Sequence, residues 1–87
     1  MVTIAFVHNR FPAGGAERIT IDIARYLKGV GGYRVYVYTT RINKMLMPEE
    51  SDEILTIRHI PSQAIPARRS AAIEKLIVSD GIDILVQ

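Results

Sequence analysis

Residues 2–18 read VTIAFVHNRFPAGGAER, and this stretch decides the fold. Its first part, Val2 to Val7, is an apolar run rich in β-branched side chains that only Thr3 interrupts. Such a run is typical of a strand buried on both faces, as in the middle of a parallel sheet. The polar and glycine-rich residues 8–15 follow, and we expect them to form a loop that leads from this strand into a helix.

The residues after this loop have the period of an amphipathic helix. Four apolar side chains recur at spacings of three or four and predict the side of the helix that faces the sheet: Ala16, Ile19, Ile23 and Leu27. Arg18 and Asp22 have the spacing of an i,i+4 ion pair. The glycines at positions 29, 31 and 32 predict the end of the helix, because glycine readily adopts the left-handed geometry of a C-terminal cap.

The remaining residues predict three more strands and a second helix. Residues 33–40 are dense in tyrosine, valine and threonine and predict a second strand, parallel to the first. Residues 41–53 predict a loop with at most a short helical turn, and residues 54–60 a third strand whose polar side chains favour a sheet edge. Pro66 suits the first turn of a second helix, whose apolar stripe lies within residues 72–77. Residues 82–86 predict the fourth strand.

This order of elements predicts one α/β domain over residues 1–87. We expect a Rossmann-like, three-layer arrangement with a parallel sheet of about four strands in the order 3-2-1-4 and helices on both faces. A strand such as residues 82–86 normally leads to another helix that covers the sheet. We therefore expect a fragment of a longer protein, whose outer strand edge is free to pair with another copy.

Composition excludes several classes of protein. The formal net charge of +2 is too small to indicate nucleic-acid binding. There is no cysteine, and the two histidines lack the spacing of metal ligands, so we expect neither a disulfide framework nor a metal site. We expect His8 to hydrogen-bond a neighbouring loop rather than a ligand. No N-terminal stretch has the layout of a signal peptide, and we therefore expect a soluble cytoplasmic protein.

Gly14 and Gly15 form the strongest local feature of the sequence. In open α/β sheets, ligands bind beyond the carboxyl ends of the strands, near the point where the strand order reverses. The start of the following helix offers free N–H groups and the positive end of the helix dipole, which suit a phosphate or diphosphate. The dinucleotide pattern GxGxxG and the P-loop pattern are both absent. From the residues alone, a tight turn and a ligand cradle both remain open.

The same stretch resembles a known family. The run from Ile4 to His8, followed by PAGGAER at residues 12–18, looks like the N-terminal signature of retaining glycosyltransferases of the GT-B fold, in the group called glycosyl transferase family 1 or glycosyltransferase family 4. DGIDILV at residues 80–86 is similar to the fourth strand of that group. The resemblance spans the whole chain, and its one sharp motif is GGAE at residues 14–17.

The resemblance implies an acceptor-side domain without the catalytic machinery. Gly14 and Gly15 would face the interdomain cleft near the diphosphate of a nucleotide-sugar donor and the acceptor. Glu17 would fix that loop, and Asn9 and Arg10 would line the same cleft, with Arg10 pairing to a phosphate or an acidic acceptor. The donor-binding C-terminal domain is absent, so no residue is assigned as catalytic and no cofactor is expected.

The implied partners are a nucleotide-sugar and a glycan or lipid-linked acceptor, in polysaccharide or lipid-glycan synthesis. The parent bacterial enzyme would be a hexosyltransferase with peripheral membrane contact, and the fragment alone is expected to be inactive. The alternative is a non-enzymatic Rossmann-like or flavodoxin-like module that binds a phosphate or nucleotide or has a regulatory role. An NAD-linked enzyme is disfavoured, because the second strand ends on Thr39 and Thr40 rather than on an acidic residue.

Overall fold

The computed structural model describes residues 1–12, 14–60 and 71–86. Their strands form a single parallel sheet in the order β3-β2-β1-β4. The strands are β1 (Val2–Phe11), β2 (Tyr33–Ile42), β3 (Thr56–His59) and β4 (Ile84–Val86). The predicted parallel orientation and strand order are therefore confirmed, and β3 lies at an edge as its polar side chains indicate.

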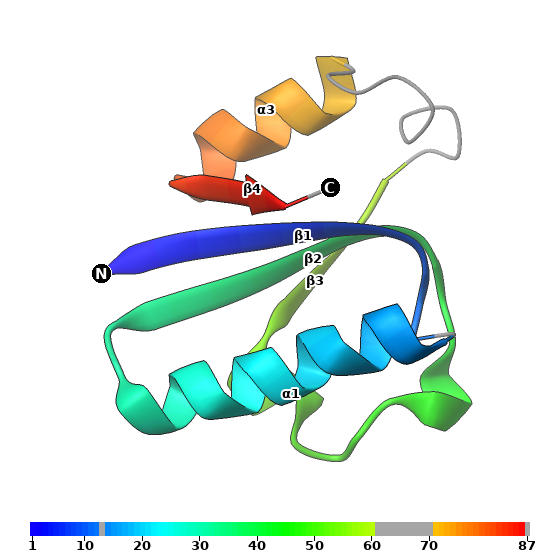
Figure 1. The fold of residues 1–87 in the computed structure, drawn as a ribbon. Helices are drawn as coiled ribbons and strands as arrows, with labels where there is room; N and C mark the ends of the chain where they lie inside the picture. The colour runs from blue at the N-terminus through cyan, green and yellow to red at the C-terminus, as the bar shows by residue number, and fades with distance from the viewer. Residues whose placement is uncertain (13, 61–70, 87) are drawn as a thin grey trace.

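Two helices cover opposite faces of the sheet. Helix α1 (Gly15–Val30) packs on one face and helix α3 (Ala71–Asp80) on the other, which gives the predicted three layers (Figure 1). The core beneath α1 contains Phe6 and Val37, and the core beneath α3 contains Ala5 and Tyr38. These pairs follow from the alternation of side chains along β1 and β2, which sends successive residues to opposite faces. The 3-10 helix η1 (Lys44–Leu46) and the short helix α2 (Ser51–Ile54) connect β2 to β3.

The first two strands are longer than the sequence predicts. Residues 8–11, expected as a loop, continue β1, and β2 extends to Ile42. Arg10 lies opposite Arg41 and Phe11 opposite Ile42 in this extension. The polar residues of this extension can continue the strand because the hydrogen bonds between β1 and β2 join backbone groups and do not require apolar side chains. Phe11 is fully buried in the core beneath α1 and holds the end of the strand against the domain.

The buried side of α1 also differs from the prediction. Ile19 is 58% exposed and Ile23 is 36% exposed, whereas Ile21 and Ala24 are buried. Leu27 packs against the core as predicted, and the side chain of Ala16 lies outside the described residues. The helix is therefore rotated from the expected orientation. The small side chain of Ala24 allows α1 to approach the sheet closely. Because α1 has apolar residues on more than one side, the helical period of the sequence was compatible with both the expected and the observed orientation.

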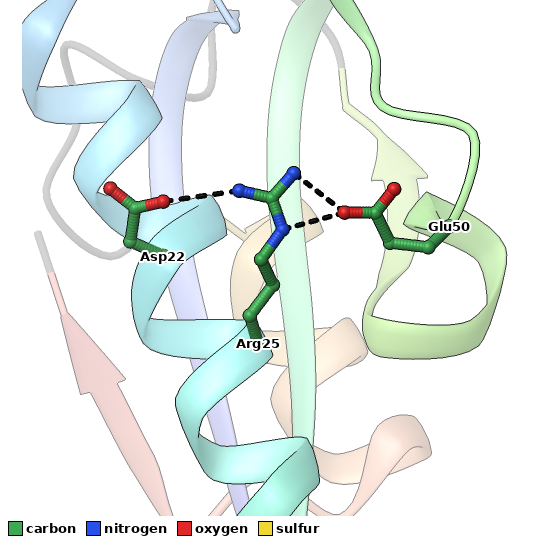
Figure 2. A network of polar contacts seen from close by, with 3 residues as sticks. All are labelled: Asp22, Arg25 and Glu50. Atoms are coloured by element: carbon green, nitrogen blue, oxygen red, sulfur yellow. Dashed lines mark hydrogen bonds and ion pairs between the residues drawn. The ribbon is translucent and has the colours of Figure 1, made fainter.

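Asp22 pairs with Arg25 rather than with Arg18. The Arg25 guanidinium lies between the carboxylates of Asp22 and Glu50, and it joins α1 to the segment before α2 (Figure 2). The partner from outside the helix explains the difference, because Arg25 is the residue of α1 that reaches Glu50. All three side chains are substantially exposed to solvent, so salt screens this network strongly.

Glycine ends both long helices as predicted. Gly31 has φ of 83° and donates its N–H to the Leu27 carbonyl, and Gly81 after α3 has φ of 66°. The third and fourth strands are shorter than expected, since Ile54 belongs to α2 and β4 begins at Ile84. The predicted position of Pro66 lies outside the described residues. None of the helices that the structure describes is long and apolar enough to cross a membrane.

Helix α3 is joined to β2 and β3 through a buried carboxylate. The Asp80 side chain is 5% exposed. Its Oδ2 accepts a hydrogen bond of 2.9 Å from the Tyr38 hydroxyl, and Arg58 donates to both carboxylate oxygens at 3.3 and 3.0 Å. Burial, followed by the bond to Asp80, raises the pKa of Tyr38 well above its usual range. These contacts hold the end of α3 against β2 and β3.

Candidate functional site

The candidate site lies at the carboxyl ends of β1 and β2. Both strands end, and α1 begins, at the same end of the molecule, where η1 also lies (Figure 1). The Asn43 N–H donates to the Phe11 carbonyl at 2.9 Å, which holds the start of the η1 segment against the end of β1. Ligands of α/β proteins usually bind at the carboxyl ends of the strands of a parallel sheet. The predicted site residues lie on β1, on α1 and at the N-cap of α1.

Gly14 and Gly15 stand at the open start of α1. Gly14 is the N-cap, and no side chain caps this end of the helix within the described residues. The φ of Gly14 is −150°, an extended conformation that any residue adopts. A β-carbon at Gly15 would meet no described atom within 4 Å. Neither backbone conformation nor internal packing therefore requires glycine here, and the space above Gly15 is open to a ligand.

Glu17 lies in the first turn of α1, below this opening. A β-carbon built on Gly14 would lie 3.6 Å from Glu17 Oε1, so the carboxylate lies beside the glycine turn. The carboxylate is also close enough to His8 to raise the pKa of the imidazole, although the burial of His8 outweighs this effect and lowers the pKa overall. Glu17 thus contributes negative charge to the space between the turn and the end of β1.

Asn9 and Arg10 are neighbours on β1 but have different surroundings. The Thr40 hydroxyl lies 2.6 Å from the Asn9 carbonyl oxygen and 2.7 Å from Asn9 Oδ1. Asn9 therefore braces β1 against β2, in addition to lying at the site. Arg10 is exposed and lines an open pocket of about 590 Å³ together with five residues of the β2 end and η1: Arg41, Ile42, Asn43, Lys44 and Met45.

His8 faces α1 rather than the pocket. Its ring stacks between Phe6 and Phe11, with centroid distances of 6.4 and 5.5 Å. His8 Nε2 and Thr20 Oγ1 share a hydrogen bond of 2.8 Å, so the partner lies on the helix and not on a neighbouring loop as expected. The histidine is half-buried at the interface between sheet and helix, and its position indicates a structural role.

The sequence reasoning missed Arg41 and Lys44. The signal was present, because Arg41 follows directly after the buried run of β2 and therefore lies at the same sheet edge as Arg10. The pocket and the glycine turn occupy one end of the domain, but neither glycine nor Glu17 lines the pocket. The part of the chain that the structure describes contains no cluster of three or more histidine or acidic side chains suited to a metal ion.

Comparison with known proteins supports a glycosyltransferase origin for the chain. No protein-family model matches it, and no solved structure matches it either. A segment of 40 residues is 45% identical to a protein described as alpha-1,3/1,6-mannosyltransferase ALG2 of Dictyostelium discoideum. The match covers 46% of this chain and 10% of the mannosyltransferase.

Proposed function

We propose that these residues belong to the acceptor-side domain of a GT-B glycosyltransferase. The enzyme would transfer a sugar from a nucleotide-sugar to a hydroxyl group of a glycan or lipid-linked acceptor. The observation that carries the proposal is the 45% identity over 40 residues to a mannosyltransferase. The GGAE motif at residues 14–17 agrees with it, through the family resemblance.

The fold supports the proposal in a second way. In the parallel sheet of order β3-β2-β1-β4, the strand order reverses beside β1, because β2 and β3 lie on one side of β1 and β4 lies on the other. The glycine turn follows β1 directly. Ligands of α/β proteins bind at such reversal points. The free N–H groups at the start of α1 favour negative charge, as in the diphosphate of a nucleotide-sugar.

We assign binding rather than catalytic roles to the residues at this edge. Gly14 and Gly15 leave room for the ligand to approach the start of α1, and Arg10 supplies a positive charge. Glu17 and Asn9 hold the turn and the end of β1 in position. The reacting groups of the enzyme lie outside these 87 residues in this proposal, so the chain alone is expected to transfer no sugar.

The proposal is tested by filling the space above Gly15. In the complete product of the gene that encodes these residues, Gly15→Arg is expected to abolish transfer, because an arginine side chain would occupy the open start of α1. Gly29→Arg is the matched control, since a β-carbon at Gly29 also meets no described atom within 4 Å but lies at the other end of α1. Both variants should melt like the wild type.

Transfer would be measured from radiolabelled nucleoside-diphosphate hexoses to glycan and lipid-linked acceptors. Loss of transfer in Gly15→Arg, with activity retained in Gly29→Arg, is the expected result. Equal turnover in both variants would show that the glycine turn does not face a substrate. A complete gene product that binds nucleotides but transfers no sugar would favour the non-enzymatic alternative.

A further inference from the structure

Three cations that have no partner among the described residues gather at the ends of β1 and β2. Arg10, Arg41 and Lys44 line the same pocket of about 590 Å³. Arg10 and Arg41 lie opposite each other in the parallel register, so their backbones are only about 5 Å apart. Within the described ranges, no hydrogen bond or ion pair joins these three side chains to another residue.

The pocket therefore carries positive charge that no side chain in its described lining neutralises. The lining residues include no carboxylate, and the amide of Asn43 adds hydrogen-bonding capacity. By contrast, Arg25 and Arg58 both have carboxylate partners. Like charges directly opposite on neighbouring strands repel each other, and a bound anion would remove that repulsion. Guanidinium groups bind phosphate oxygens through paired N–H donors, which makes phosphate the best-matched anion.

Apolar side chains border the cations on the η1 side. Met45 is 95% exposed and Ile42 is 38% exposed, and both line the pocket. Leu46, the next residue of η1, is 45% exposed. Cations beside exposed apolar side chains suit an amphiphile, because the phosphate binds the cations while the alkyl part covers the apolar surface.

We propose that this pocket binds the phosphate or diphosphate group of an amphiphilic ligand. Arg10 and Arg41 hold the phosphate oxygens, Lys44 adds a third positive charge, and Met45 and Ile42 contact the first alkyl groups. The inference rests on the proposed function in that the ligand would be the acceptor, and it narrows that acceptor to a phosphate-bearing lipid. The residues that line the pocket do not include the glycine turn, so the pocket can be tested separately from it.

The test is a binding experiment on the 87-residue chain. One arm titrates inorganic pyrophosphate and follows backbone amide shifts by NMR. The second arm measures sedimentation with phosphatidylcholine vesicles that contain phosphatidic acid, compared with phosphatidylcholine alone. Arg41→Gln is the test variant, and Arg34→Gln is its control because Arg34 is an exposed arginine near the opposite end of the same strand.

We expect pyrophosphate to shift the amides of residues 10 and 41–45, and phosphatidic acid vesicles to bind the chain. Arg41→Gln should weaken both interactions about tenfold, because it removes charge-assisted hydrogen bonds to phosphate. Arg34→Gln should leave them nearly unchanged. Pyrophosphate binding without vesicle binding would assign the pocket to a soluble phosphate compound and overturn the lipid part of the proposal.

Absence of both interactions, or equal weakening by both variants, would overturn the phosphate site itself. Neither arm includes sugar transfer, so a failure here is distinct from a failure of the proposed function. If the complete product transfers sugar but this pocket binds no phosphate, the assignment of the glycine turn stands. Only the proposed class of acceptor would then be wrong.

Discussion

Removal of the Tyr38 hydroxyl tests how α3 is held against the sheet. In Tyr38→Phe the ring remains in the core beneath α3, and only the hydrogen bond of 2.9 Å to Asp80 Oδ2 is lost. Asp80 keeps both bonds from Arg58, but its Oδ2 then has only the longer one of 3.3 Å. Because the Asp80 side chain is 5% exposed, water cannot readily replace the missing donor.

The expected cost follows from the type of bond. A hydrogen bond to a charged group contributes about 1.5–3 kcal/mol, and the greater apolarity of phenylalanine offsets a small part of its loss. We therefore expect the free energy of unfolding to fall by about 2 kcal/mol. For a domain of this size, such a loss lowers the melting temperature by about 8–16 °C.

Thermal and urea unfolding, followed by circular dichroism, would measure this change. The control is Tyr33→Phe, which removes the same atom from a 40% exposed tyrosine of the same strand. The raised pKa of Tyr38 adds a second signature. Above pH 10 the tyrosine ionises more readily in the unfolded chain than in the folded one, so stability falls as pH rises, and Tyr38→Phe should reduce that slope. Equal melting temperatures for the two variants would refute the buried network.

Two further predictions concern His8 and Arg25. Burial lowers the pKa of His8 below 6.5, so the unfolded chain takes up a proton first as the pH falls, and the free energy of unfolding should decrease below pH 6.5. His8→Gln should reduce this decrease in pH-dependent urea titrations, and the same result from His59→Gln would contradict the assignment. Arg25→Gln should lower the melting temperature at low salt but not at high salt, because the contacts with Asp22 and Glu50 are exposed to solvent. An equal decrease in melting temperature at both salt concentrations would argue against a screened ion-pair network.

The sequence was sufficient for the architecture because patterning and chirality constrain it tightly. Continuous apolar strands separated by helical segments allow few arrangements other than a parallel sheet with right-handed crossovers. The end of β1 was missed because His8, Asn9 and Arg10 have polar side chains, whereas the strand is defined by backbone bonds to β2. The orientation of α1 was missed because it depends on Ala24 and on the bond between Thr20 and His8, which are tertiary contacts.

The candidate site was only partly predictable. Gly14, Gly15 and Glu17 were found as a local motif, since they adjoin one another in the chain. The cationic pocket was not found, because Arg41 and Lys44 join Arg10 only through the pairing of β1 with β2. Whether an arginine has a partner depends on the folded arrangement. The difference between Arg25, which pairs with Glu50, and Arg41, for which the described part of the chain offers no partner, therefore had no counterpart in the sequence.

Sugar transfer is the most direct test of the central claim. The complete gene product would be incubated with labelled nucleoside-diphosphate hexoses and with phosphate-bearing lipid acceptors, in parallel with the 87-residue chain. We predict a labelled glycolipid from the complete product and none from the 87-residue chain. The assignment as a glycosyltransferase domain would be contradicted if the complete, folded product transferred sugar from none of these donors to any of these acceptors.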